Sequence, residues 1–317
     1  MTLAEQLDAG TGTTRPPRRR ARRKSTALSL TDRIVLLLMV GIPAVVHVAL
    51  VWVPTIGSIV LSFSEWDGIG GLSDIKWIGT KNYVDVFTAY PRFWPAVAHN
   101  LIWLVFLIVI PTAFGLLMAV LLDRKMRFSS IYQSILYLPV VLSLALVGFI
   151  WQLMYEPDKG LVNNLIGQVG HINWLGDSSI NLYAVLVAAA WRHTGYVMLL
   201  FLAGLKALDP ALKEAASLDG ANSWQTFWRV TFPVLKPINI IVLVVTVIEA
   251  LRAYDIVFII NRGRNGLELL SILITDNIIG ESSRIGYGSA IAVVLLVISL
   301  GFIITYLVQV FRKEERS

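Results

Sequence analysis

Four charged side chains stand inside stretches that are otherwise apolar. Glu249, Arg252 and Asp255 fall within the run VIEALRAYDIVF, and Arg192 falls within a second apolar stretch. Carboxylates accept hydrogen bonds and guanidinium groups donate them, so together these side chains suit a hydroxylated ligand. Each charge at the centre of a bilayer costs about 2.5–3.5 kcal/mol on insertion scales. Four such charges therefore require partners or water.

Two interpretations of these charges remain open. The three-residue spacing places Arg252 one helical turn from both Glu249 and Asp255, which predicts two ion pairs within one helix. In the first interpretation, these pairs and Arg192 form a neutral, self-contained cluster that fixes helix packing. In the second, the four side chains line a polar cavity that a hydroxylated solute enters.

The composition indicates a membrane protein. Of the 317 residues, 56% are hydrophobic and 15% are charged, whereas an ordinary soluble domain has about 25% charged residues. Cysteine is absent, and the four histidines lie in separate segments without metal-ligand spacing. The sequence therefore predicts no disulfide, thiol chemistry or metal site.

Six segments have the roughly 20 apolar residues that a membrane-spanning helix needs. They are residues 34–63, 97–122, 131–155, 181–205, 237–260 and 287–310. The first segment is far longer than the apolar region of a cleavable signal peptide, so we interpret it as an uncleaved first helix. We predict an all-α, polytopic bundle of six transmembrane helices.

The distribution of Lys and Arg predicts the orientation of the bundle. The N-terminal segment, residues 123–130 and 205–236 and the C-terminal segment together carry 18 basic residues, whereas the opposite loops carry 7. The positive-inside rule then places both termini in the cytoplasm. Residues 1–30 contain the run RPPRRRARRK and predict a disordered cytoplasmic tail that contacts anionic lipid head groups rather than nucleic acid.

The cytoplasmic loop 205–236 has the pattern of two short helices. Asp209 is a good N-cap, Pro210 suits the first helical position, and Gly220 suits the turn after the helix ends. Ser223 is the predicted cap of a second helix that ends before Pro233. The first helix could dock into a groove of a partner protein or lie on the lipid surface, and its periodicity does not decide between them.

A motif in this loop resembles a known family. Glu-Ala-Ala, two residues, Asp-Gly-Ala and a proline twelve residues further on are similar to the EAA loop of binding-protein-dependent ABC importer permeases, close to the maltose-permease branch. The resemblance covers residues 31–317, which we interpret as one permease domain, and includes Asn82, Asn100 and Pro139. The motif positions are Glu214, Ala215, Ala216, Asp219, Gly220, Ala221, Phe227 and Pro233.

The resemblance implies a type I ABC importer permease fold in a prokaryotic cytoplasmic membrane. The loop would be the coupling helix that docks into a cytoplasmic ATPase subunit, where Glu214 would pair with a basic residue. Expected partners are a second, homologous permease, two ATPase subunits that carry ATP and Mg²⁺, and an extracellular or periplasmic solute-binding protein. This chain would bind no cofactor and catalyse no reaction, since it has no GxxxxGK[ST] loop.

The resemblance also implies a solute path on the fourth and fifth helices. The sugar contacts of the maltose-permease family correspond by position to Trp191, Thr194, Gly195, Met198, Leu251, Arg252 and Asp255. We add Arg192 and Glu249 because they belong to the charged group. Most of these side chains differ from the family pattern, and the run NRGRNGLELL replaces a Gly-Gly-Pro stretch after the fifth helix. We therefore expect a sugar other than maltose, or else a polyol or glycerol phosphate.

Two other functional classes fit less well. An ion-coupled secondary transporter usually shows related halves or paired broken helices, and the sequence has no such repeat. A lipid phosphotransferase would need several acids around a metal, but after Asp219 no acid follows until Glu249.

The orientation can be tested directly, because the chain has no cysteine of its own. Single cysteines at Ser73 and Ser178 should react with an impermeant thiol reagent added to intact cells, and one at Ser223 should react only after the membrane is opened. Reaction of the Ser223→Cys variant in intact cells would reverse the orientation.

Overall fold

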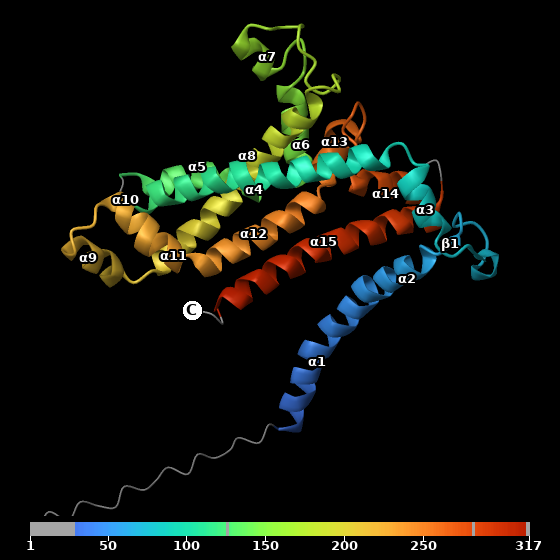
Figure 1. The fold of residues 1–317 in the computed structure, drawn as a ribbon, viewed down its shortest axis with the longest axis horizontal. Helices are drawn as coiled ribbons and strands as arrows, with labels where there is room; N and C mark the ends of the chain where they lie inside the picture. Colours follow the sequence, from blue (N-terminus) through green and yellow to red (C-terminus); the bar gives the residue numbers. More distant parts are fainter. Residues whose placement is uncertain (1–28, 125–126, 281–282, 315–317) are drawn as a thin grey trace, which may run out of the picture. The chain divides into compact units, whose positions relative to one another are not determined.

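The computed structural model describes residues 29–124, 127–280 and 283–314. The predicted basic run of the tail lies outside the described residues. The chain divides into two compact units, one that ends at Pro54 and one that begins at Thr55. Each unit is described by itself. Almost all regular structure is helical (Figure 1), with one two-stranded sheet among the described residues.

The first unit is helical from Leu30 onward. Helix α1 (Leu30–His47) starts at Ser29, whose hydroxyl accepts a hydrogen bond from the Asp32 amide at 3.1 Å, while the Asp32 carboxylate accepts one from the Ser29 amide at 3.0 Å. This reciprocal capping box satisfies two amides that a helix start leaves free. The π-helical turn η1 (Val48–Trp52) then leads into α2 (Val53–Leu61), which continues into the second unit. The large apolar side chains of α1 are exposed, as expected for a lipid-facing helix.

In the described residues, four helical stretches are long and apolar enough to cross a membrane, and two bent pairs bring the number to six if each pair is one span. The four are residues 30–61, α4 (Phe93–Asp123), α8 (Asn181–Ala207) and the apolar part of α15 (Ile285–Glu314). The bundle is therefore all-helical, as predicted. The count of six spans and the orientation stay predictions.

The third and fifth predicted helices are not continuous, so those two predictions were wrong in detail. The third is α5 (Ser129–Val141) followed by α6 (Leu144–Met154), with a bend of 100° between them. The bend follows Pro139, and Ser143 caps the new helix by accepting a hydrogen bond from the Leu146 amide at 3.2 Å. A proline removes one backbone donor and a capping serine starts a new helix, so the chain changes direction here.

The fifth predicted helix is broken at its charged residues. Helix α12 (Lys236–Leu251) ends one residue before Arg252, and α13 (Asp255–Asn261) begins after three residues. The break frees backbone carbonyls, and the hydroxyl of Ser271 donates to one of them, the carbonyl of Ala253. Non-helical backbone at membrane depth is tolerated only when protein or water satisfies it in this way.

Among the described helices, α4 and α8 share the most extensive interface. Gly115 of α4 lies so near α8 that a Cβ atom placed there would be 2.7 Å from Val197 Cγ1 and 3.0 Å from the Met198 amide nitrogen. On its other side, Gly195 of α8 packs against the Leu136 carbonyl of α5. Small residues at such crossings let helices approach closely in a membrane, where apolar burial supplies little attraction between helices.

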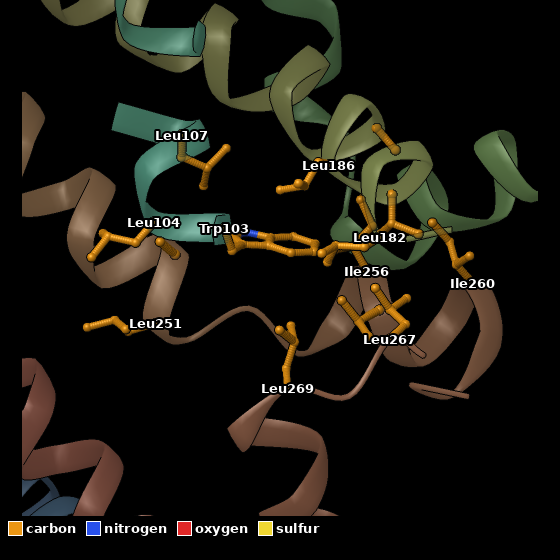
Figure 2. Close-up of a cluster of buried hydrophobic side chains, with 14 of the residues drawn as sticks. Trp103, Leu104, Leu107, Leu182, Leu186, Leu251, Ile256, Ile260, Leu267 and Leu269 are labelled. Carbon is orange, nitrogen blue, oxygen red and sulfur yellow. The ribbon is translucent and has the colours of Figure 1, made fainter. Parts of the chain in front are cut away.

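Apolar side chains of several elements meet around Trp103, which is 1% exposed. Figure 2 shows the Trp103 ring among leucine and isoleucine side chains that come from α4, α8, α13 and the segment before α14 (Leu270–Ile278). Helix α12 packs against both α4 and α15 (Figure 1). The broken segment 252–254 is therefore supported by a packed core on one side.

The connections near the predicted outer ends of the helices are held by buried asparagines. The hairpin β1 (Ser64–Glu65) and β2 (Lys76–Trp77) precedes α3 (Lys81–Thr88), where Asn82 donates to the Ser62 and Ser64 carbonyls at 2.9 and 2.8 Å. Asn100 accepts from the Leu270 amide at 2.9 Å. A third asparagine, Asn163 of α7 (Leu161–Ile166), donates to the Pro157 and Ile172 carbonyls. The family-like residues Asn82 and Asn100 thus hold loops in place.

The α4–α8 contact gives a stability prediction. Gly115→Ala should lower the thermal unfolding midpoint of the purified protein, because forcing a methyl group into packed space costs about 1–3 kcal/mol. Gly301→Ala is the matched control: no described atom beyond the local helix backbone lies within 4 Å of the added methyl group, and alanine favours a helix by about 1 kcal/mol over glycine. The control should melt at the wild-type temperature or higher. Equal melting of the two variants would contradict close packing at Gly115.

Candidate functional site

A cavity of about 230 Å³ lies between α8 and α12 at the point where α12 ends. All four charged residues that the sequence singled out line it. Helix α8 contributes Arg192, α12 contributes Glu249, and the break and the start of α13 contribute Arg252 and Asp255. The remaining walls are formed by Trp103, Leu107, Leu144, Ala189, His193, Ala253, Tyr254 and Ile256.

The ion pair in this cavity joins two helices rather than one. Arg192 Nη1 donates to Glu249 Oε1 at 3.0 Å, with side chains 24% and 37% exposed. The prediction that Arg252 pairs with both acids was wrong, because α12 ends at Leu251 and the one-turn spacing is lost. The Nε of Arg192 is buried and has no hydrogen-bond partner among the described residues.

Arg252 and Asp255 are exposed, and within the described part of the chain neither side chain forms an ion pair or a hydrogen bond. Unpaired charges in a low-dielectric core would be costly, but water in an open cavity can solvate them. The two side chains therefore present a guanidinium donor and a carboxylate acceptor to whatever enters the cavity.

Sequence reasoning missed His193, which is 3% exposed and lies beside Arg192. Its Nε2 is 2.9 Å from the hydroxyl of Thr246 on α12, and that hydroxyl donates to the Val242 carbonyl at 2.7 Å. Because the threonine proton is already used, Nε2–H is the donor to Thr246, which leaves Nδ1 as an acceptor in the neutral ring. A histidine next to an arginine in an apolar segment was the sequence signal.

The other residues carried over from the maltose-permease branch do not line this cavity. Gly195, Met198 and Leu251 are buried in helix packing. Trp191 is 38% exposed, and its ring meets Trp151 edge-on at 5.9 Å between centroids. Thr194 is half-buried. The structure thus brings together the charged part of the predicted path and leaves these five side chains outside the cavity.

The loop between α8 and α12 begins with the helix that the sequence predicts. Helix α9 (Pro210–Leu218) starts at Asp209, whose carboxylate accepts from the Ala211 amide at 2.9 Å. Gly220 follows with φ +80°, a left-handed conformation that glycine adopts at little cost. Across this turn the Ala221 amide donates to the Ala216 carbonyl at 3.0 Å.

The motif residues of α9 divide by exposure. Glu214 is exposed and its side chain forms no ion pair or hydrogen bond with the described residues, whereas Ala216 is 8% exposed and faces the protein. Ala215, Asp219 and Gly220 are exposed. Lys213, next to Glu214, bonds Asp123 at the end of α4 at 2.8 Å. The exposed face of α9 is thus free to meet a partner, while its other face is tied to α4.

The second half of the loop differs from the prediction in two ways. Asn222, not Ser223, caps α10 (Ser223–Thr226), because Asn222 and Gln225 form a reciprocal capping box with both bonds at 2.9 Å. The helical path also does not end before Pro233. It passes through the π-helical segment η3 (Phe227–Thr231) into α11 (Phe232–Val234), which contains Pro233.

Residues 111–317 match the family model described as binding-protein-dependent transport system inner membrane component. The chain is 34% identical over 271 residues to an osmoprotective compounds uptake permease protein of Synechocystis sp., which covers 83% of this chain and 94% of the relative. It is 32% identical over 278 residues to a xylose/arabinose import permease protein of Haloferax volcanii, with 86% and 87% covered.

A solved structure agrees at the level of the fold. A crystal structure of a bacterial ABC transporter involved in the import of the acidic polysaccharide alginate superposes with a TM-score of 0.76 at 20% identity, covering 89% of this chain and 96% of that chain. The family match spans more than half of the chain and includes both the loop with its exposed Glu214 and the four charged residues of the cavity. The chain therefore belongs to the binding-protein-dependent transport system inner membrane components, the permease subunits of ABC importers.

Proposed function

We propose that this permease forms one half of the translocation path for a sugar or a related polyhydroxy solute, and that loop 205–236 couples the path to cytoplasmic ATPase subunits. The observation that carries the proposal is the cavity in which Arg252 and Asp255 are free while Glu249 is paired with Arg192. The import of xylose and arabinose by a relative with 32% identity supports a sugar.

The unpaired side chains of Arg252 and Asp255 match the chemistry of a neutral polyol. A carboxylate accepts hydrogen bonds from two vicinal hydroxyls, and a planar guanidinium donates to ring and hydroxyl oxygens from the other side. The four charges of the cavity sum to zero, so a neutral solute adds no uncompensated charge to the membrane interior. Trp191 precedes Arg192 on α8 but lies outside this cavity, so its aromatic face would reach the solute only after the helices have moved.

The two faces of α9 can couple the ATPase subunits to the solute path. Glu214 is exposed and available to a cation on an ATPase subunit, and Lys213 connects α9 to α4 through Asp123. Because α4 packs closely on α8, a displacement of α9 is transmitted to the helix that carries Arg192. ATP binding by the partners would bias the permease between two packed arrangements. A second permease, two ATPases with ATP and Mg²⁺, and a solute-binding protein complete this transporter.

The solute class is tested with the assembled transporter in proteoliposomes and a panel of neutral mono- and disaccharides, polyols and glycerol phosphate, measured as binding-protein-stimulated ATP hydrolysis. At least one neutral sugar should stimulate. Polyols are the second class to examine, together with osmoprotective compounds, which the relative with 34% identity takes up. Stimulation by glycerol phosphate alone would refute the sugar assignment.

The cavity gives a prediction with an internal control. Arg252→Ala should insert and assemble at wild-type abundance, because it strands no partner, yet lower solute uptake at least tenfold, which corresponds to losing about 1.4 kcal/mol of binding. Trp191→Ala should lower uptake in the same way.

Arg192→Ala should instead lower abundance, because it leaves Glu249 without its partner in the membrane interior. The double variant Arg192→Ala/Glu249→Ala should restore abundance but not uptake. Normal uptake by Arg252→Ala and Trp191→Ala would remove these residues from the path and leave the charges a structural role.

The loop gives a separate prediction. Glu214→Ala should leave the permease inserted, weaken its association with the ATPase subunits and reduce uptake, since the carboxylate has no partner within the described structure to lose. Gly220→Pro should act similarly by forbidding the left-handed turn. Arg229→Ala, an exposed substitution in η3, is the control and should leave association unchanged. Wild-type association and uptake of both loop variants would exclude a docking role for α9.

A further inference from the structure

An apolar groove of about 540 Å³ lies between the end of α4 and the segment formed by α10 and η3. Helix α4 contributes Leu116, Leu117, Val120 and Leu121, and the opposite wall carries three aromatic rings. The single charged residue on its lining is Arg124, directly after the last residue of α4. The groove is separate from the charged cavity and from the exposed face of α9.

The aromatic wall of the groove has the character of a membrane interface. Trp224 and Trp228 are 70% and 44% exposed, their ring centroids are 5.6 Å apart, and Phe227 packs edge-on against Trp228. Indole rings have an apolar body and one N–H donor, and short helices rich in Trp and Phe lie at the boundary between acyl chains and water. The wall therefore has the composition of a segment that lies at that boundary.

The charge at the end of the groove is uncompensated. Asp123 is occupied by Lys213 at 2.8 Å, and Arg124 is exposed with no acidic partner among the described residues. An apolar groove that ends in a single free guanidinium matches a molecule with a hydrocarbon chain and an anionic phosphate, since guanidinium and phosphate form paired hydrogen bonds.

We propose that an anionic phospholipid binds in this groove, with an acyl chain along α4 and the aromatic wall and its phosphate on Arg124. The lipid then bridges α4 and the α10–η3 segment, while the Lys213–Asp123 pair connects α4 to α9 of the same loop. Headgroup charge in the cytoplasmic leaflet thereby stabilises the position of loop 205–236. In the predicted orientation α4 ends at that leaflet, and lipid binding there does not depend on which solute is transported.

The test uses the assembled transporter in nanodiscs of phosphatidylcholine that contain a trace of phosphatidylglycerol with a photoactivatable group on one acyl chain. Phosphatidylglycerol should label the peptides that contain Leu116–Leu121 and Trp224–Trp228. Arg124→Gln should lower this labelling about fivefold, the effect of one basic residue near an anionic lipid. Labelling by photoactivatable phosphatidylcholine should be weaker and unaffected.

Two further variants separate the headgroup from the groove. Arg127→Gln removes an exposed arginine that does not line the groove and should leave labelling unchanged. Ala113→Phe fills the groove from an exposed position of α4 and should lower labelling by both lipids.

Either of two results would overturn the proposal. Equal labelling by the two lipids that Arg124→Gln does not change would show that the headgroup charge is not recognised. Absence of lipid labelling, with a photo-crosslinker at Trp224 capturing another subunit of the transporter, would show that protein covers the groove. Binding-protein-stimulated ATP hydrolysis is measured in the same nanodiscs, so failure of every sugar to stimulate it, with intact lipid labelling, would count only against the proposed solute.

Discussion

The ion pair between Arg192 and Glu249 determines how the charged part of the bundle is arranged. It joins α8 to α12 at 3.0 Å, and one turn away the bond from His193 to Thr246 joins the same two helices. A pair of this kind resists separation, because a lone charge left in the membrane interior costs far more than a lone charge in water. With Glu249 occupied, the opposite charges of Arg252 and Asp255 remain available, and the cavity between the helices is polar without carrying net charge.

Backbone geometry then sets where those free charges point. An unbroken helix would place Glu249, Arg252 and Asp255 on neighbouring turns of one face, where they would neutralise one another. The end of α12 at Leu251 and the restart at Asp255 prevent this. The break is tolerated because Ser271 satisfies the Ala253 carbonyl and because Ile256 and Leu251 anchor both sides in the core. A local loss of helix therefore exposes charges that a regular helix would have paired.

Local patterns in the sequence predicted the elements that depend on local chemistry. Apolar length located the long apolar helices α4, α8 and α15, and Asp209, Pro210 and Gly220 defined the limits of α9, because capping and turn preferences act over three or four residues. The same reasoning chose Ser223 over Asn222 as a cap, since it overlooked the reciprocal partner Gln225. It also could not place Glu249 beside Arg192, because that contact joins residues 57 positions apart and depends on how α8 and α12 pack.

The contacts of α4 connect the cytoplasmic loop to the cavity. At one end Asp123 bonds Lys213 of α9, and in the middle Gly115 allows α8 to approach within contact distance of its backbone. A flexible contact along this route would absorb a movement of α9. A closely packed contact instead transmits the movement of α9, because packed interfaces change between discrete arrangements rather than deform continuously. The close contact at Gly115 is thus also the contact through which, in the proposed coupling, α4 and α8 would move together and pass a displacement of α9 on toward Arg192 and the charged cavity.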